Sequence, residues 1–171
     1  MDDTNARSNA RSTKVLDEEY LADLEARSID DLRAMHAECL ELETEVSYVR
    51  RLAQARMDIL EAEIGRRERG GSVGELIELL PQILADSGPR GDPATSRLPM
   101  QMAPEQDSEW APQLEALEAT LSDIPALTED QLHEAITGLR GLEREVSDQR
   151  RALFAVIDRI DLVLAERLRA E

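Results

Sequence analysis

The sequence has few of the residues that proteins use for mixed cores or for covalent cross-links. Aromatic residues make up 2% of its 171 residues, so a core must be built from aliphatic side chains. Cys39 is the only cysteine, which excludes a disulfide within the chain. It lies in a helical apolar pattern, so we expect it to be buried.

Long apolar runs are also missing. No run approaches the roughly 20 residues that span a bilayer. The polar start, Met1 to Thr13, lacks the apolar stretch of a signal peptide. These features predict a cytoplasmic protein that does not enter the membrane.

Positive charge is scarce. Lys14 is the only lysine, the other basic residues are arginines, and the formal net charge is -17. Such a chain repels nucleic-acid backbones and anionic membrane surfaces. We therefore expect no direct DNA binding and no membrane binding, and a basic protein surface suits the chain better as a partner.

Alanine, glutamate, leucine and arginine are abundant, and no window alternates apolar and polar residues as a half-buried strand does. The sequence therefore predicts an all-α protein. Serine and threonine stand where two long helices would begin: Ser28 precedes Asp31, and Thr128 precedes Gln131, in the spacing of a capping box.

Helix breakers and apolar content divide the chain into five expected segments. Five of the seven prolines lie between Pro89 and Pro112, which indicates a linker. Within the first repeat we expect a short helix from Leu16 to Ala26 and a long helix that stops at Gly70 and Gly71. The segments are a disordered tail over 1–15, a first helical repeat over 16–70, a short apolar helix over 71–86, a flexible linker over 87–110 and a second helical repeat over 111–171.

The short apolar helix is too apolar to stand alone in water, and its apolar residues run from Leu76 to Leu84. It can pack on the rest of this chain or serve as a contact for a partner. The sequence leaves both alternatives open.

The two repeats align without a gap when the sequence is shifted by 100 residues. A heptad pattern would explain recurring leucines. It would not explain serine, arginine and aspartate recurring at fixed offsets. Among the polar residues that recur are Glu43, Ser47, Arg50 and Asp58 in the first copy, and Glu143, Ser147, Arg150 and Asp158 in the second.

Each long helix is expected to carry an apolar seam with a polar stripe beside it. At about 100° per residue, Glu43, Ser47, Arg50, Gln54 and Asp58 fall within a stripe of roughly 80°. The two seams would pack together as an antiparallel two-helix coiled-coil hairpin, leaving the stripes on its surface. The hairpin could form within one chain or between chains. The seams consist of Leu42, Val46, Val49, Ala53, Met57, Leu60 and Ile64, and of Leu142, Val146, Leu153, Ile157, Ile160 and Leu164.

The stripe has the chemistry of a guanine-nucleotide site. Arginine offers a donor fork to the O6 and N7 atoms of guanine or to phosphate oxygens. A carboxylate accepts hydrogen bonds from the opposite edge of guanine, and serine suits a phosphate or a sugar. Two copies of the stripe imply a ligand, or a pair of ligands, with two-fold character.

The spacing E-x-x-x-S-x-x-R-x-x-x-Q-x-x-x-D resembles the signature of the RsiG family of actinobacterial anti-sigma factors. The first copy fits at every position, from Glu43 to Asp58. The second copy fits at Glu143, Ser147, Arg150 and Asp158 but has Phe154 in place of glutamine.

The resemblance implies an antiparallel coiled coil that binds a dimer of cyclic di-GMP and then sequesters the sporulation sigma factor WhiG. It implies that Arg50 and Arg150 contact guanine or phosphate, and that Asp58 and Asp158 hold guanine edges. Ser47 and Ser147 would reach the phosphate and sugar, and Glu43 and Glu143 would orient the arginines or accept from a base. The predicted nucleotide-binding residues are Glu43, Ser47, Arg50, Gln54, Asp58, Glu143, Ser147, Arg150 and Asp158.

A ligand-free coiled-coil scaffold or adaptor is the rival interpretation, because solvated helix flanks often carry glutamate, arginine and aspartate. The sequence contains no phosphate loop, nucleophile elbow or zinc spacing. We therefore expect no catalytic constellation and no metal site.

Overall fold

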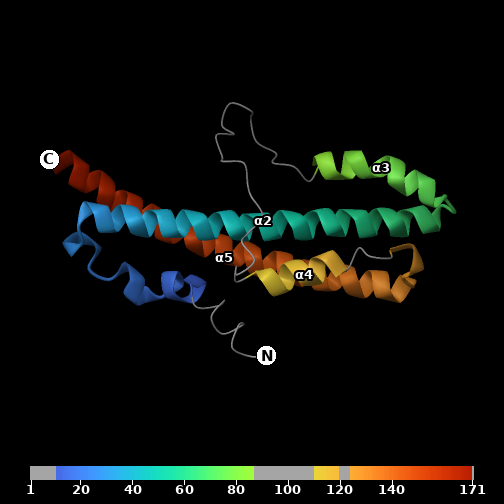
Figure 1. Cartoon of the computed structure of the whole chain (residues 1–171), viewed down its shortest axis with the longest axis horizontal. Helices are drawn as coiled ribbons and strands as arrows, with labels where there is room; N and C mark the ends of the chain where they lie inside the picture. Colours follow the sequence, from blue (N-terminus) through green and yellow to red (C-terminus); the bar gives the residue numbers. More distant parts are fainter. Residues whose placement is uncertain (1–10, 87–109, 120–123, 171) are drawn as a thin grey trace. The chain divides into compact units, whose positions relative to one another are not determined.

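The computed structural model describes residues 11–86, 110–119 and 124–170 (Figure 1). No strand occurs among these residues, and the expected linker falls almost wholly on residues outside them. A helical turn over 11–16 comes first. It is followed by η1 (Glu18–Leu21), η2 (Leu24–Ala26), α2 (Ile29–Glu68), α3 (Val73–Asp86), α4 (Ala111–Ala119), η3 (Ile124–Ala126) and α5 (Glu129–Ala170).

The long helices α2 and α5 pack against each other in opposite directions, as predicted. The chain divides into two compact units, and both long helices, α2 and α5, contribute residues to each unit. Unit 1 includes the chain up to Ser47 and from Ser147 onward, and there His36 pairs with Asp161. Unit 2 includes the described residues from Tyr48 to Asp86 and from Pro112 to Val146. In this structure the contacts between α2 and α5 join residues of one chain.

The core is mainly aliphatic, as the scarcity of aromatic residues predicts, although Tyr20 and Trp110 are also buried. Most residues of the two predicted seams are buried, whereas Met57, Ile64, Leu142 and Leu164 are partly exposed. Cys39 is buried and free. Each large aliphatic side chain removed from water stabilises the fold by about 1.5–3 kcal/mol. The buried seam residues are Leu42, Val46, Val49, Ala53 and Leu60 on α2, and Val146, Leu153, Ile157 and Ile160 on α5.

Both long helices begin with the capping boxes that the sequence predicts. The Asp31 amide donates to Ser28 Oγ at 3.1 Å, and the Ser28 amide donates back to Asp31 Oδ2 at 3.4 Å. The Gln131 amide donates to Thr128 Oγ1 at 3.3 Å, and the Thr128 amide donates to Gln131 Oε1 at 2.8 Å. These contacts satisfy amides that the first turn of a helix leaves without partners.

The end of α2 lies where the two glycines predicted it. Gly70 has φ of 66°, a left-handed conformation in which glycine carries no steric cost. The Gly70 amide donates to Arg67 O and the Gly71 amide to Arg66 O, which is the Schellman pattern of a helix C-terminus.

An arginine near the C-terminus of each long helix donates hydrogen bonds to the turn that precedes the other long helix. In unit 2, Arg67 donates to Leu127 O at 2.7 Å and Ile124 O at 3.1 Å. In unit 1, its counterpart Arg167 donates to Glu25 O, in the turn η2. Because η2 and η3 also correspond at the 100-residue offset, the repeat extends to the contacts that close each end of the hairpin.

Two expectations for the N-terminal region are corrected. The residues from Leu16 to Ala26 do not form one helix, because Ala22 is extended and Asp23 is left-handed between η1 and η2. Of the tail expected over 1–15, residues 1–10 lie outside the described residues, while residues 11–15 are helical. Val15 within this turn is fully buried, so packing orders a segment whose composition is mostly polar.

Helix α3 runs back above the C-terminal half of α2 after the glycine turn (Figure 1). Leu76 is buried, so α3 does pack on its own chain. Ile77 is 61% exposed and Val73 43% exposed, so another face of the same helix presents apolar side chains to solvent. Pro81 lies inside α3 and does not end it.

Candidate functional site

In unit 1, polar residues of the motif meet between α2 and α5. Nε of Arg150, on α5, donates to Glu43 Oε1 at 2.7 Å and to Ser47 Oγ at 2.8 Å, both on α2. Ser47 Oγ also donates to Glu43 Oε1 at 2.6 Å. Glu43 and Ser47 are buried, at 9% and 6% exposure, and the side chain of Arg150 is 36% exposed. The buried carboxylate therefore holds an arginine whose outer part faces solvent.

Unit 2 contains a looser cluster of the same kind. Gln54 Nε2, on α2, donates to Glu143 Oε1, on α5, at 3.1 Å. Arg50 Nη1 lies 3.7 Å from the same carboxylate oxygen. The Nε atom of Arg50 is buried, and no acceptor lies within hydrogen-bond distance among the described residues. A buried donor in this state costs free energy unless something accepts its hydrogen bond.

The two clusters are counterparts under the 100-residue offset. Glu43 and Arg150 in unit 1 correspond to Glu143 and Arg50 in unit 2. Each pair joins a glutamate on one long helix to an arginine on the other. The sequence analysis identifies all four residues and expects the glutamates to orient the arginines or accept from a base. It does not predict which glutamate faces which arginine, because the pattern on one helix does not fix its register against another. The opposite charges at the motif's first and third positions were the signal available for that pairing.

The motif residues are not all on the surface, which corrects the expected position of the stripes. Asp58 and Asp158 are exposed, and Ser147 is partly exposed. Glu43 and Ser47 are buried because the antiparallel packing brings Arg150 over them. The structure thus brings together Glu43, Ser47 and Arg150 in unit 1, and Arg50, Gln54 and Glu143 in unit 2.

Phe154 occupies the position where the second copy departs from the motif. Its ring lies against the guanidinium of Arg150, with 4.6 Å between the guanidinium carbon and the ring centre. A cation over an aromatic face is attracted by the ring quadrupole. Phe154 therefore belongs to the unit 1 cluster although it cannot form the hydrogen bond that Gln54 forms in unit 2.

Comparison with protein families matches residues 18–84 to the family described as RsiG-like. Residues 18–84 are RsiG-like. The RsiG-like segment contains the complete motif from Glu43 to Asp58 and most of α3. Proteins of the RsiG-like family are anti-sigma factors, which are regulatory proteins that bind sigma factors. No curated protein matches the chain.

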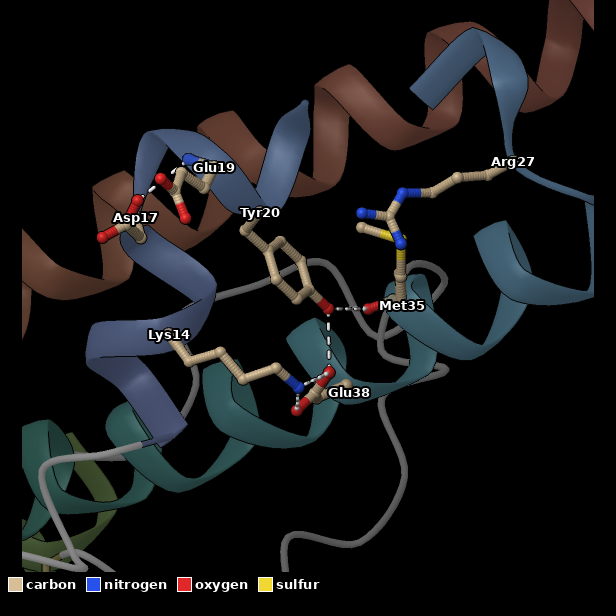
Figure 2. Close-up of a pocket in the computed structure, with 7 residues that line it drawn as sticks. All are labelled: Lys14, Asp17, Glu19, Tyr20, Arg27, Met35 and Glu38. Carbon is tan, nitrogen blue, oxygen red and sulfur yellow. Dashed lines mark hydrogen bonds and ion pairs between the residues drawn. The ribbon is translucent and has the colours of Figure 1, made fainter. Parts of the chain in front are cut away.

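A pocket of about 450 Å³ lies at the start of the RsiG-like segment and has different chemistry from the motif clusters (Figure 2). Glu38 accepts from Lys14 Nζ at 3.0 Å and from Tyr20 Oη at 2.8 Å. Burial, together with the hydrogen bond to Glu38, raises the pKa of Tyr20, so its hydroxyl remains a donor. Arg27 extends toward Met35 in the same pocket (Figure 2).

Carboxylates outnumber cations in this pocket. Asp17, Glu19 and Glu38 line it together with only Lys14 and Arg27. An anionic ligand therefore finds less favourable charge here than at the motif arginines. Sequence reasoning missed the pocket because its residues come from turns and one face of α2 that share no motif.

The described part of the chain contains no group of three histidine, cysteine or acidic side chains placed to hold a metal ion. Within the same residues, no helix is both long enough and apolar enough to cross a membrane.

Proposed function

We propose that this protein is an anti-sigma factor whose two motif clusters bind cyclic di-GMP and whose nucleotide-bound form sequesters a WhiG-like sporulation sigma factor. The observation that carries the proposal is the recurrence of one arrangement in both units. In each unit, an arginine from one long helix faces a motif glutamate from the other.

The donor set of each cluster fits a guanine nucleotide. The two hydrogen bonds from Arg150 to Glu43 and Ser47 use Nε, so its terminal nitrogens can be directed at the O6 and N7 of guanine or at a phosphate. The buried Nε of Arg50 lacks an acceptor among the described residues. Exposed Asp58 and Asp158 lie on the same stripes and can accept from the N1 and N2 groups of guanine. Two clusters favour a pair of nucleotides, in agreement with a dimer of cyclic di-GMP.

The nucleotide would act by bridging the helices within each unit. A ligand held by Arg150 and Ser47 contacts α5 and α2 together, and thereby favours one relative geometry of the two helices. A sigma factor that binds this geometry more tightly is bound more tightly when nucleotide is present. Thermodynamic linkage then requires sigma to increase the affinity for nucleotide by the same factor.

The surface of the protein suits such a partner. The net charge of -17 complements the basic DNA-binding faces of sigma factors, and like-charge repulsion discourages DNA. The exposed apolar side chains of Val73 and Ile77 on α3 are a candidate contact for sigma. They supplement the acidic surface with apolar area that can be buried on binding.

A ligand-free coiled-coil adaptor is the second candidate, and one specific observation favours it. The pairs Glu43–Arg150 and Arg50–Glu143 already join α2 to α5 without a ligand. In that case the motif would serve only to fix the register of the hairpin. Titration separates the two candidates.

Calorimetric titration of cyclic di-GMP into the purified protein tests the proposed ligand. We expect saturable binding with a stoichiometry that shows a nucleotide pair, and much weaker binding of GMP, which cannot span a cluster in the same way. Ser47→Ala should weaken binding, whereas Thr44→Ala, which removes only a hydroxyl bonded to Leu40 O on the same helix, should not. Absence of binding, verified by a second assay, would support the adaptor.

A further inference from the structure

Phe154 is the one large apolar side chain in the motif clusters. It is the only phenylalanine of the chain and is 37% exposed. Its counterpart at the 100-residue offset, Gln54, bonds to the glutamate of the unit 2 cluster at 3.1 Å. Phe154 instead packs on the arginine of the unit 1 cluster. At this motif position, Gln54 therefore contacts the glutamate of its ion pair, whereas Phe154 contacts the arginine.

The guanidinium of Arg150 is fixed by three groups. Glu43 and Ser47 accept from its Nε, at 2.7 and 2.8 Å, and its central carbon lies over the Phe154 ring. The guanidinium of Arg50 has one carboxylate oxygen at 3.7 Å, and its Nε has no acceptor among the described residues. The terminal nitrogens of Arg150 are thus held in one orientation, while those of Arg50 are less constrained.

We propose that Phe154 is a positioning residue that makes the two nucleotide sites unequal, with the unit 1 site the tighter one. The inference rests on the proposed function. A donor fork that is already oriented loses less conformational entropy when it binds guanine or phosphate than one that is free to rotate. Unit 1 binds the first nucleotide for this reason, and unit 2 binds the second.

Replacement of Phe154 provides the first test. Phe154→Leu keeps an apolar side chain but removes the aromatic face, and we expect about a fivefold loss of affinity for the first cyclic di-GMP, in the range of an exposed cation–π contact. Phe154→Tyr keeps the face and should retain the affinity of the natural protein. Phe154→Leu should have no further effect in an Arg150→Gln background, because the contact is then already absent. Equal affinity of the natural protein and Phe154→Leu would overturn the proposal.

NMR of the protein without nucleotide tests the contact between Phe154 and Arg150 independently of the proposed function. In the free protein, the ring current of Phe154 should displace the NMR signals of the Arg150 side chain. We expect this displacement to vanish in Phe154→Leu and to persist in Phe154→Tyr. Unchanged Arg150 signals in Phe154→Leu would overturn the positioning role. Absence of cyclic di-GMP binding by the natural protein would instead overturn the proposed function, and with it the role of Phe154 in affinity.

Discussion

Arg150→Ala is expected to reduce the affinity for cyclic di-GMP by about 10- to 100-fold, since hydrogen bonds to charged groups contribute about 1.5–3 kcal/mol. The variant loses the terminal nitrogens that would bind the nucleotide. It also leaves the buried carboxylate of Glu43 without its cation. Arg50→Ala should have a similar effect through the unit 2 cluster. Calorimetric titration measures both losses, and circular dichroism verifies that the helices persist.

Arg151→Ala is the matched control for this prediction. Arg151 is the next residue on α5, its side chain is 77% exposed, and it pairs with Asp148 on the same helix. Its removal changes the net charge as Arg150→Ala does, but it leaves the cluster intact. Arg150→Lys keeps the charge and loses the donor fork, so it should fall between the two. Normal binding by both Arg50→Ala and Arg150→Ala would show that the clusters do not hold the nucleotide.

The second large effect is expected at Glu63, a fully buried carboxylate in unit 2. Arg66 Nε donates to Glu63 Oε2 at 2.7 Å, and Arg67 Nε donates to Glu63 Oε1 at 2.6 Å. Arg67 in turn holds the turn before α5 through Leu127 O. Glu63→Gln should lower the free energy of unfolding by about 2 kcal/mol at pH 7, because the charged acceptor of both arginines is lost.

This contribution should depend on pH in a defined direction. The hydrogen bond from Arg66, followed by that from Arg67, holds the pKa of Glu63 below its ordinary value. A carboxyl group with a lowered pKa in the folded state stabilises the fold fully above its unfolded pKa of about 4.3 and loses this contribution as pH falls through the folded pKa. The difference in stability between the natural protein and Glu63→Gln should therefore shrink below about pH 4.3.

Urea denaturation followed by circular dichroism between pH 7 and pH 3 measures this difference. Glu61→Gln is the control, because Glu61 pairs with Arg140 across the helices at 2.8 Å while both side chains are about half exposed. Exposed pairs contribute about 0–1 kcal/mol, so this variant should differ little from the natural protein. Equal stability of the natural protein and Glu63→Gln at pH 7 would contradict the account of Glu63.

Local sequence signals predicted the elements that depend on local chemistry. Ser28 and Thr128 identified the starts of α2 and α5, and Gly70 identified the end of α2, because caps are formed by residues close in sequence. The apolar period of Leu42, Val46 and Val49 identified the buried seam. These positions were predictable because one helix is sufficient to define them.

Features that depend on how two segments meet were not predicted. The contact of Arg150 with Glu43 requires the register of α5 against α2, which no single-helix pattern contains. Glu63 lies outside the predicted seam, and its burial depends on Arg66 and Arg67 one turn later. Asp23 adopts a left-handed conformation that interrupts the expected helix, and the apolar pattern of the sequence does not reveal it.

Nucleotide and sigma factor are expected to bind cooperatively to this protein. Titration of cyclic di-GMP into the protein alone and into the protein saturated with a WhiG-like sigma factor measures this cooperativity. We predict that sigma increases the affinity for nucleotide, and that the reverse titration shows nucleotide increasing the affinity for sigma by the same factor. Nucleotide affinity that is identical with and without bound sigma would contradict the proposed switch.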